Sequence, residues 1–234
     1  MMKSKKAFTL AEVLITLGII GVVATLTLPN VMANYAKKSQ VAQLQRSVNA
    51  VSSAIGNYLL DKKTDNFADT NFSADPSEFF TDYLGGTYIG TYYGTDLGSA
   101  FKKQYKRVGD TYGEYDISTA INNGNNGNGC SLLYRDFACG KLVTGATVCL
   151  SRYANYDATK ENDDQVFLSI VDVNSDAGPN IFGRDLFTMA FSKKGRTVLP
   201  ETYGYEYCKN GNFYNGAEYY CFSTIVTDGW EMNY

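Results

Sequence analysis

The sequence predicts an α+β protein in which a long N-terminal helix packs on an antiparallel β-sheet domain. An apolar run at residues 8–28 is followed by an amphipathic stretch at 29–60, and together they predict one continuous helix. Residues 61–234 form the globular domain, whose short segments rich in Val, Ile, Phe and Thr are separated by turn residues, as is typical of strands. The predicted strands are residues 141–152, 165–173, 185–192 and 195–200, with a hairpin turn at 192–195.

The first apolar segment is long enough to cross a membrane. Residues 8–28 carry a single charge, Glu12, and as a helix they would span about 32 Å, which matches the roughly 30 Å hydrocarbon core of a bilayer. Three lysines precede the segment within residues 1–7. The positive-inside rule therefore predicts a single-span protein with its short end in the cytoplasm and the rest exported.

Glu12 is the unusual residue of this segment, because a carboxylate in lipid is costly. A plain membrane anchor, or a secretory signal cleaved after residues 31–33, leaves its presence unexplained. A cut between Ala7 and Phe8 explains it, because the new α-amine then lies close to Glu12 and is mostly protonated at neutral pH. Between helices staggered by about one turn, the amine of one chain meets the carboxylate of the next, so Glu12 would set the axial register of helices packed against copies or relatives of themselves.

The stretch KKAFTLAEVLITLGIIGVVATLTLP resembles the N-terminus of type IV prepilins and type II secretion pseudopilins. It has a basic leader, a small residue before the cut, Phe8 as first mature residue, Glu12 as the fifth and Pro29 as the twenty-second. Ala7 stands where the family more often has glycine, and it is small enough for the peptidase pocket. The resemblance covers about a quarter of the chain. It implies that residues 1–7 are a leader peptide, removed by prepilin peptidase before the Phe8 amine is methylated.

The resemblance also implies partners and a location. The partners are copies of the chain, other pilins or pseudopilins, prepilin peptidase and an inner-membrane assembly platform. The chain is then a single-pass inner-membrane protein before assembly, and its head domain is periplasmic or extracellular in a filament. Gly18 and Gly21 let helices approach closely, and Pro29 kinks the helix; in the family, the helix between such positions melts on assembly. The alternative is that membrane helices simply tolerate these residues.

The amphipathic stretch continues the helix into the globular domain. Its apolar residues recur every three or four positions and form a stripe that must pack on a sheet: Val41, Leu44, Val48, Val51, Ile55 and Tyr58. We expect the helix to end near Leu60. The irregular connection after it contains a short helix at 75–86, with Asp75 as its cap and Glu78 completing a capping box. Residues 122–129, rich in Asn and Gly, are expected to form a loop.

Five cysteines beyond the apolar segment predict disulfides in an oxidising compartment, because no C-x-x-C pair marks a zinc or thioredoxin-type site. Cys208 and Cys221 bracket a loop with two Asn-Gly turns, and a bridge between them would stabilise the fold by about 3 kcal/mol in the loop-entropy model. Pilins commonly have a C-terminal disulfide loop, which this loop resembles in position. Cys130, Cys139 and Cys149 would then supply one more bridge and one spare thiol, with the pairing open.

One segment is a candidate metal site. Asp172, Asn174 and Asp176 alternate like the start of a calcium loop, and Asp185 lies beyond them. The glycine of the pattern is one place late for an EF-hand, and the twelfth position is not glutamate. Some pseudopilins hold calcium in a comparable loop, whereas a polar turn between two strands explains the same residues without a metal. No other cofactor is expected.

Composition excludes several functions. The chain has no histidine, which excludes a Ser-His-Asp triad and an imidazole-ligated zinc site. It has no nucleophile elbow or phosphate loop, so we do not expect an enzyme. A net charge of −3 disfavours nucleic acid as a partner. The leading prediction is a structural subunit of a type IV pilus or type II secretion pseudopilus. The alternative is a minor tip pilin acting as an adhesin or ligand-binding subunit through tyrosine-rich loops.

Overall fold

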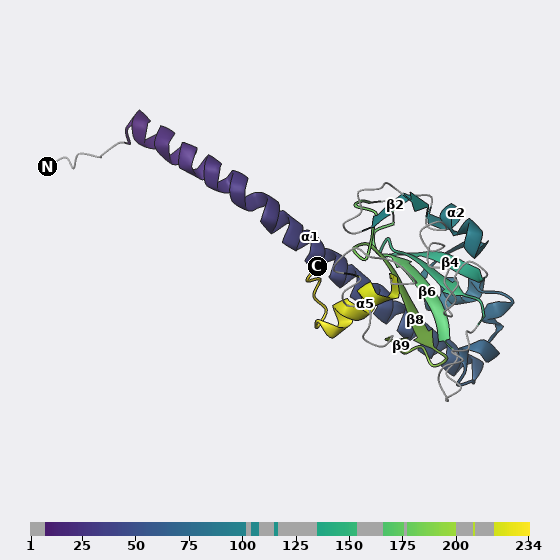
Figure 1. Cartoon of the computed structure of the whole chain (residues 1–234). Helices are drawn as coiled ribbons and strands as arrows, with labels where there is room; N and C mark the ends of the chain where they lie inside the picture. The colour runs from purple at the N-terminus through teal and green to yellow at the C-terminus, as the bar shows by residue number, and fades with distance from the viewer. Residues whose placement is uncertain are drawn as a thin grey trace. The chain divides into compact units, whose positions relative to one another are not determined.

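The chain forms two compact units, Met1–Ser39 and Gln40–Tyr234. Helix α1 (Leu10–Lys62) contributes to both, and the second unit is an α+β domain in which this helix packs against a β-sheet, as the sequence predicts. The computed structural model (Figure 1) describes residues 8–101, 104–107, 115–116, 135–153, 166–175, 177–199, 208 and 218–234.

The first unit contains the apolar half of α1. The helix continues through Pro29 without a break, although proline lacks the amide that would donate to the carbonyl of Thr25. The hydroxyl of Thr25 donates to the carbonyl of Gly21 at 2.7 Å, and the hydroxyl of Thr27 donates to that of Val23 at 2.9 Å. Such bonds compete with the helical ladder. In the part of the chain that the structure describes, α1 is the one helix long and apolar enough to cross a membrane.

The sheet is mixed rather than purely antiparallel, which corrects the prediction. Within the described residues its order is β1-β4-β5-β6-β8-β7-β2-β3, with β9 paired to β8. Strands β1, β4, β5, β6 and β8 pair antiparallel, but β7 pairs parallel with both β8 and β2. Strand β8 follows β7 after the turn at 183–185 and runs in the same direction. Strand β2, which is distant in sequence, pairs with the other side of β7. The bounds are β1 Gly86–Tyr93, β2 Gln104–Arg107, β3 Tyr115–Asp116, β4 Asp136–Leu142, β5 Thr147–Ser151, β6 Val166–Asp172, β7 Ile181–Phe182, β8 Leu186–Ser192 and β9 Thr197–Val198.

Three of the four predicted strands are present as β6, β8 and β9. The fourth, at 141–152, is partly confirmed, because residues 147–151 form β5 and residues 141–142 end β4. A turn separates these two strands, and in it the amide of Gly145 donates to the carbonyl of Leu142 at 2.9 Å. Gly145 has a φ of +90°, which glycine adopts without strain. Strand β1 was not predicted, because Gly86 and Gly90 interrupt its pattern of Tyr and Thr.

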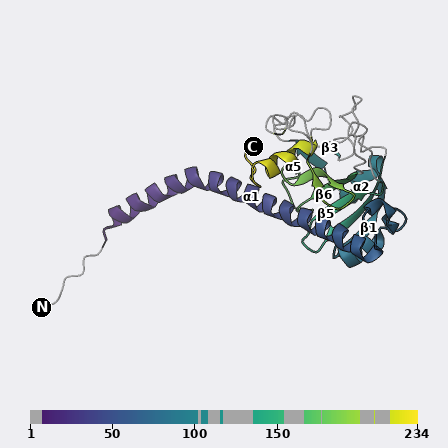
Figure 2. The same ribbon diagram turned by 90° about the horizontal axis from the view of Figure 1, so that it is seen from below.

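Both faces of the central strands are covered. All five residues of β5 are buried, as are six of the seven in β6, so neither strand alternates between a dry and a wet face. Helices α1 and α5 (Glu218–Thr227) lie on the two sides of these strands (Figure 2), and α5 lies against β8. The sequence predicted a loop where α5 begins. The remaining short helices are Phe67–Asp69, Asn71–Ser73, Phe79–Tyr83, Gly94–Asp96 and α2 at Leu97–Phe101.

The second half of α1 confirms the predicted apolar stripe, whose six residues are each at most 5% exposed. The helix ends at Lys62, two residues later than expected. The hairpin between β8 and β9 lies directly on this part of the helix. The hydroxyl of Ser52 donates to the carbonyl of Gly195 at 2.6 Å, and a Cβ at Gly195 would lie 2.9 Å from the Cβ of Ile55.

An aromatic cluster joins the end of α1 to the sheet. The ring of Tyr58 lies 5.5 Å from that of Phe79, and the ring of Phe67 lies 4.8 Å from that of Phe167 in β6. Both pairs pack edge to face, an arrangement that aromatic rings favour. One part of the core of the globular domain therefore lies between α1 and the sheet, and α5 adds Phe222 and Ile225 to the same core.

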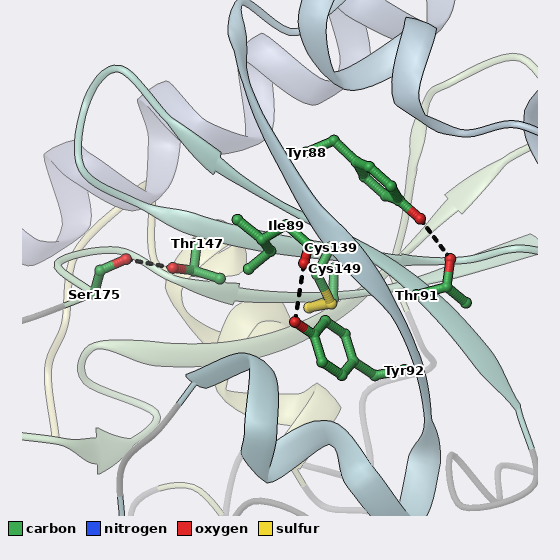
Figure 3. Close-up of a disulfide and its surroundings, with 8 residues drawn as sticks. All are labelled: Tyr88, Ile89, Thr91, Tyr92, Cys139, Thr147, Cys149 and Ser175. Atoms are coloured by element: carbon green, nitrogen blue, oxygen red, sulfur yellow. Dashed lines mark hydrogen bonds between the residues drawn. A yellow bond between two sulfur atoms is a disulfide. The ribbon is translucent and has the colours of Figure 1, made fainter.

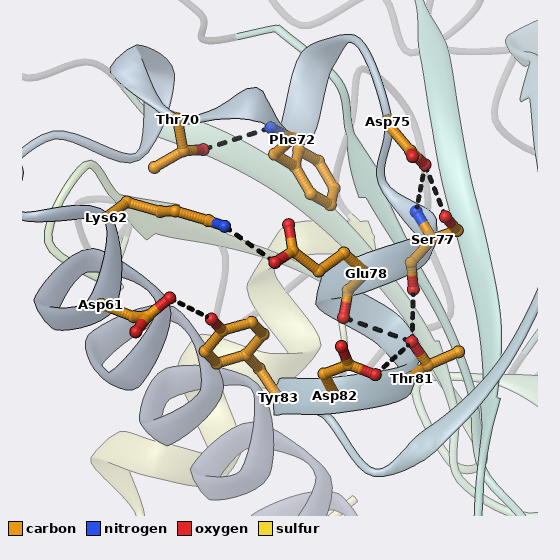
Figure 4. Close-up of polar contacts among 10 residues, drawn as sticks. All are labelled: Asp61, Lys62, Thr70, Phe72, Asp75, Ser77, Glu78, Thr81, Asp82 and Tyr83. Carbon is orange, nitrogen blue, oxygen red and sulfur yellow. Dashed lines mark hydrogen bonds and ion pairs between the residues drawn. The ribbon is translucent and has the colours of Figure 1, made fainter.

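Polar contacts close the edge of this cluster (Figure 4). Asp75 caps the helical turn as predicted, accepting hydrogen bonds from the amide and hydroxyl of Ser77. The predicted capping box is wrong in its second half. The Glu78 carboxylate instead forms an ion pair with Lys62 at 2.7 Å, because the end of α1 lies beside this turn. The hydroxyl of Tyr83 donates to Asp61 at 2.6 Å.

Candidate functional site

The first turn of α1 is closed by a capping box. Thr9 precedes the helix, and its amide and hydroxyl both donate to the Glu12 carboxylate at 2.8 Å. In return, the amide of Glu12 donates to the Thr9 hydroxyl at 3.3 Å. This reciprocal arrangement satisfies two of the amides that a helix start leaves without partners. The sequence signal was present as Thr-x-x-Glu, but Glu12 was interpreted as a partner for the new Phe8 amine and not for Thr9.

The surface of the first unit is apolar and exposed. Phe8 is 86% exposed, whereas Ala7 lies outside the described residues. At Gly18 and Gly21, an added Cβ would meet no atom within 4 Å, so the backbone is open to a close approach by another helix. The exposed apolar residues between 8 and 28 are Phe8, Leu10, Val13, Leu14, Ile15, Leu17, Ile19, Ile20, Val22, Val23, Leu26 and Leu28. A surface of this kind needs lipid or other helices to cover it.

Cys208 and Cys221 form a disulfide that is buried beside the turn before β8. A Cβ at Gly183 in this turn would lie 2.7 Å from the Cys221 sulfur, and Gly183 has a φ of +79°. The hydroxyl of Tyr234 donates to the carbonyl of Gly183 at 2.5 Å. The disulfide, the turn and the C-terminal segment are therefore packed together, with Cys221 carried by α5.

A second disulfide joins Cys139 to Cys149, which face each other across β4 and β5 (Figure 3). Both cysteines are fully buried. Figure 3 shows Ile89 and Tyr92 of the edge strand β1 beside this bridge, and the Tyr92 hydroxyl donates to the Ile89 carbonyl at 3.0 Å. Cys130 lies outside the described residues.

The residues of the candidate calcium loop are occupied by hydrogen-bond donors. Asp172 Oδ1 accepts from the amides of Asn174 at 3.1 Å and Ser175 at 2.9 Å. Asp185 accepts from the amides of Asn180 at 2.5 Å and Ile181 at 2.6 Å.

Asp176, the remaining ligand candidate, lies outside the described residues. Among those described, no cluster of three or more Cys, Asp or Glu side chains is arranged to hold a metal ion. The donors around Asp172 and Asp185 are those of a polar turn, and calcium binding stays a prediction.

Asp185 is expected to make stability depend on pH. Burial, together with the nearby Asp172 carboxylate, raises the pKa of Asp185 to about 6, although the amides that it accepts from oppose the rise. The folded state therefore favours the protonated acid. Asp185 contributes most to the free energy of unfolding below a pH of about 4, where it is protonated in both states. This contribution falls by roughly 3 kcal/mol as the pH rises through 6.

The measurement is urea unfolding at several pH values between 4 and 7, for the wild type and for Asp185→Asn. The variant is expected to be less stable at low pH, because an amide side chain cannot accept from both backbone amides. It is also expected to lose the Asp185 part of the pH dependence, so the two curves converge as pH rises. Parallel curves for the two proteins would contradict this prediction.

Comparison with known proteins identifies the N-terminal segment. Residues 2–28 match the family model described as the prokaryotic N-terminal methylation motif. Comparison with curated proteins and with solved structures found no match. The motif and the exposed apolar helix together fit a pilin anchored in the inner membrane. Residues 2–28 therefore carry the prepilin-type signal of type IV pilins and pseudopilins.

Proposed function

We propose that this chain is a structural subunit of a type IV pilus or a type II secretion pseudopilus. The observation that carries the proposal is the methylation motif at residues 2–28. Between residues 8 and 28 the apolar side chains are exposed and the one charge is Glu12. The subunit is inserted in the inner membrane and cleaved between Ala7 and Phe8 by prepilin peptidase. The new amine is methylated, and an assembly platform then stacks the subunits into a filament.

The capping box gives Glu12 a partner within its own chain before assembly. In the single chain its carboxylate accepts two hydrogen bonds from Thr9, which lowers the cost of holding it in lipid. In the filament the same carboxylate pairs with the Phe8 amine of a neighbouring subunit. Glu12 therefore has a weak partner within its own chain and a charged partner between chains, and the difference favours the assembled state.

Glu12→Ala is expected to lower incorporation into filaments roughly tenfold or more, because an amine left without a counter-charge inside a helix bundle costs a few kcal/mol. Cleavage between Ala7 and Phe8 is expected to remain intact. The measurement compares the amount of the variant in sheared filaments with its amount in the membrane, and follows processing by the loss of the leader. Incorporation at the wild-type level would contradict the role of Glu12 in register.

Two matched variants separate charge from helix capping. Glu12→Gln keeps an acceptor for Thr9, since glutamine also completes a capping box, but it removes the charge. Thr9→Ala removes the hydroxyl and keeps the charge. If register depends on charge, Glu12→Gln assembles as poorly as Glu12→Ala, and Thr9→Ala assembles nearly as well as the wild type. The opposite pattern would mean that the cap, rather than the ion pair, is what assembly requires.

Mass spectrometry of sheared filaments and of the membrane fraction tests the proposed function itself. A peptide that begins at methylated Phe8 and is enriched in the filaments is the result expected for a pilus subunit. The same peptide retained in the envelope is the result expected for a pseudopilus subunit. A mature chain that begins at Asn34 would overturn the proposal, because it would identify an ordinary secretory signal.

A further inference from the structure

Two buried carboxylates hold the connection between β6 and β8. Asp172 is 1% exposed and Asp185 is fully buried. Charges at such depth are costly unless other groups compensate them. A bound calcium ion would do so by gathering six to eight oxygen ligands at about 2.3–2.6 Å. The described contacts offer another solution, because N–H and O–H groups converge on the carboxylate oxygens.

Tyr105 supplies the contact that comes from farthest along the chain. Its hydroxyl donates to Asp172 Oδ2 at 2.5 Å, while the two backbone amides of the loop occupy Oδ1. The Tyr105 side chain is fully buried, and its ring lies 6.4 Å from that of Phe101 and 5.6 Å from that of Phe182. These neighbours fix the ring, so the hydroxyl is held at the carboxylate before any ligand binds.

Two more contacts hold the same connection, one from β2 and one from β5. Strand β2, which carries Tyr105, pairs with β7 through Lys106 and Ile181, and the Lys106 amide donates to the carbonyl of Asn180 at 2.8 Å. From β5, the hydroxyl of Thr147 is hydrogen-bonded to that of Ser175 (Figure 3). Two separate strands, β2 and β5, therefore position the loop through polar contacts made by the protein alone.

From these contacts we propose a metal-free latch, which holds the two described ends of the connection between β6 and β8, at residues 172–175 and 180–185. In this latch, the Tyr105 hydroxyl and the backbone amides around Asp172 and Asp185 point their partial positive charges at the carboxylates. They thereby take the place that a calcium ion has in a calcium loop. The partial charges on these hydrogens face the carboxylates and disfavour the entry of a cation. The globular domain then reaches full stability without calcium, and Tyr105 is its positioning residue.

Thermal unfolding of the full chain in detergent tests the latch, with EDTA or excess calcium as the probe. For the wild type, the two midpoints are expected to agree within about 1 °C. Tyr105→Phe is expected to lower the midpoint by roughly 3–10 °C under both conditions, because it leaves a buried carboxylate oxygen without its donor. Tyr83→Phe is the matched control, since its hydroxyl also donates to an aspartate but at the exposed surface, and its midpoint is expected to change by about 1 °C or less.

Two results would overturn the proposal. The first is a midpoint of the wild type that calcium raises by several degrees, since a ligand that binds only the folded state stabilises it. The second is a Tyr105→Phe midpoint equal to that of Tyr83→Phe.

Hydrogen exchange of the wild type gives a test that needs no variant. The amides of Asn174, Ser175, Asn180 and Ile181 are expected to be equally protected in EDTA and in calcium. Protection that disappears in EDTA would also overturn the proposal.

Discussion

Gly140→Ala is expected to lower the free energy of unfolding by roughly 2–4 kcal/mol. A Cβ at this position in β4 would overlap Cδ1 of Phe80 and lie 2.8 Å from its Cε1. The Phe80 ring is fully buried and contacts the rings of Phe72, Phe79 and Tyr88, so it has little room to move away. Even one methyl group would therefore push the aromatic cluster away from the sheet.

Urea unfolding followed by Trp230 fluorescence measures this loss. Gly56→Ala is the matched control, because Gly56 lies in α1 with no atom within 4 Å of an added Cβ. Alanine there is expected to be neutral or to stabilise the protein by up to about 1 kcal/mol, as alanine favours a helix over glycine. If Gly140→Ala were as stable as the wild type, the aromatic cluster would be shown to repack without cost.

Removing the Cys208–Cys221 disulfide is expected to cost about 3 kcal/mol or more of unfolding free energy. The bridge closes a loop with a sequence separation of 13, for which chain entropy alone predicts a loss of about 3 kcal/mol. The sulfur of Cys221 also packs against the turn at Gly183, and two serine hydroxyls would fill this buried space poorly. The double variant Cys208→Ser/Cys221→Ser combines both losses.

Hydrogen exchange distinguishes this disulfide from the other. In Cys208→Ser/Cys221→Ser, the amides of α5 are expected to exchange faster than in the wild type, because the helix loses its covalent link. In the matched variant Cys139→Ser/Cys149→Ser, the loss is expected at β4 and β5 instead, with α5 still protected. Unchanged α5 protection in both variants would show that packing against β8 holds the helix without the bridge.

Local patterns predicted α1 well, whereas α5 was expected to be a loop. The stripe from Val41 to Tyr58 could be read from sequence because the residues that share a helix face are close in sequence. The pairing of β2 with β7 could not, since Lys106 and Ile181 are brought together only by the folded domain. The capping box predicted at Glu78 was wrong for a related reason, because its carboxylate pairs with Lys62 at the end of α1.

In the candidate site, too, features of consecutive residues could be predicted and contacts between distant residues could not. The apolar segment and Glu12 were identifiable because their chemistry is written in consecutive residues. The pairing of Cys139 with Cys149 was left open, because it depends on where the chain turns between them, and residues 141–152 were expected to form one uninterrupted strand. Tyr105 was not noticed at all. No local pattern links it to Asp172, and only the three-dimensional contact shows that the two residues act together.

The continuity of α1 has a mechanical consequence. Tension applied at Gln40 along the helix is carried into the head domain by the helical segment that runs from there to Lys62. The packing contacts of the apolar stripe from Val41 to Tyr58 then share a force that is parallel to the helix. They would have to break together rather than one after another from one end. A domain attached in this way is expected to resist pulling along its helix more strongly than peeling from the side, as the proposed filament subunit requires.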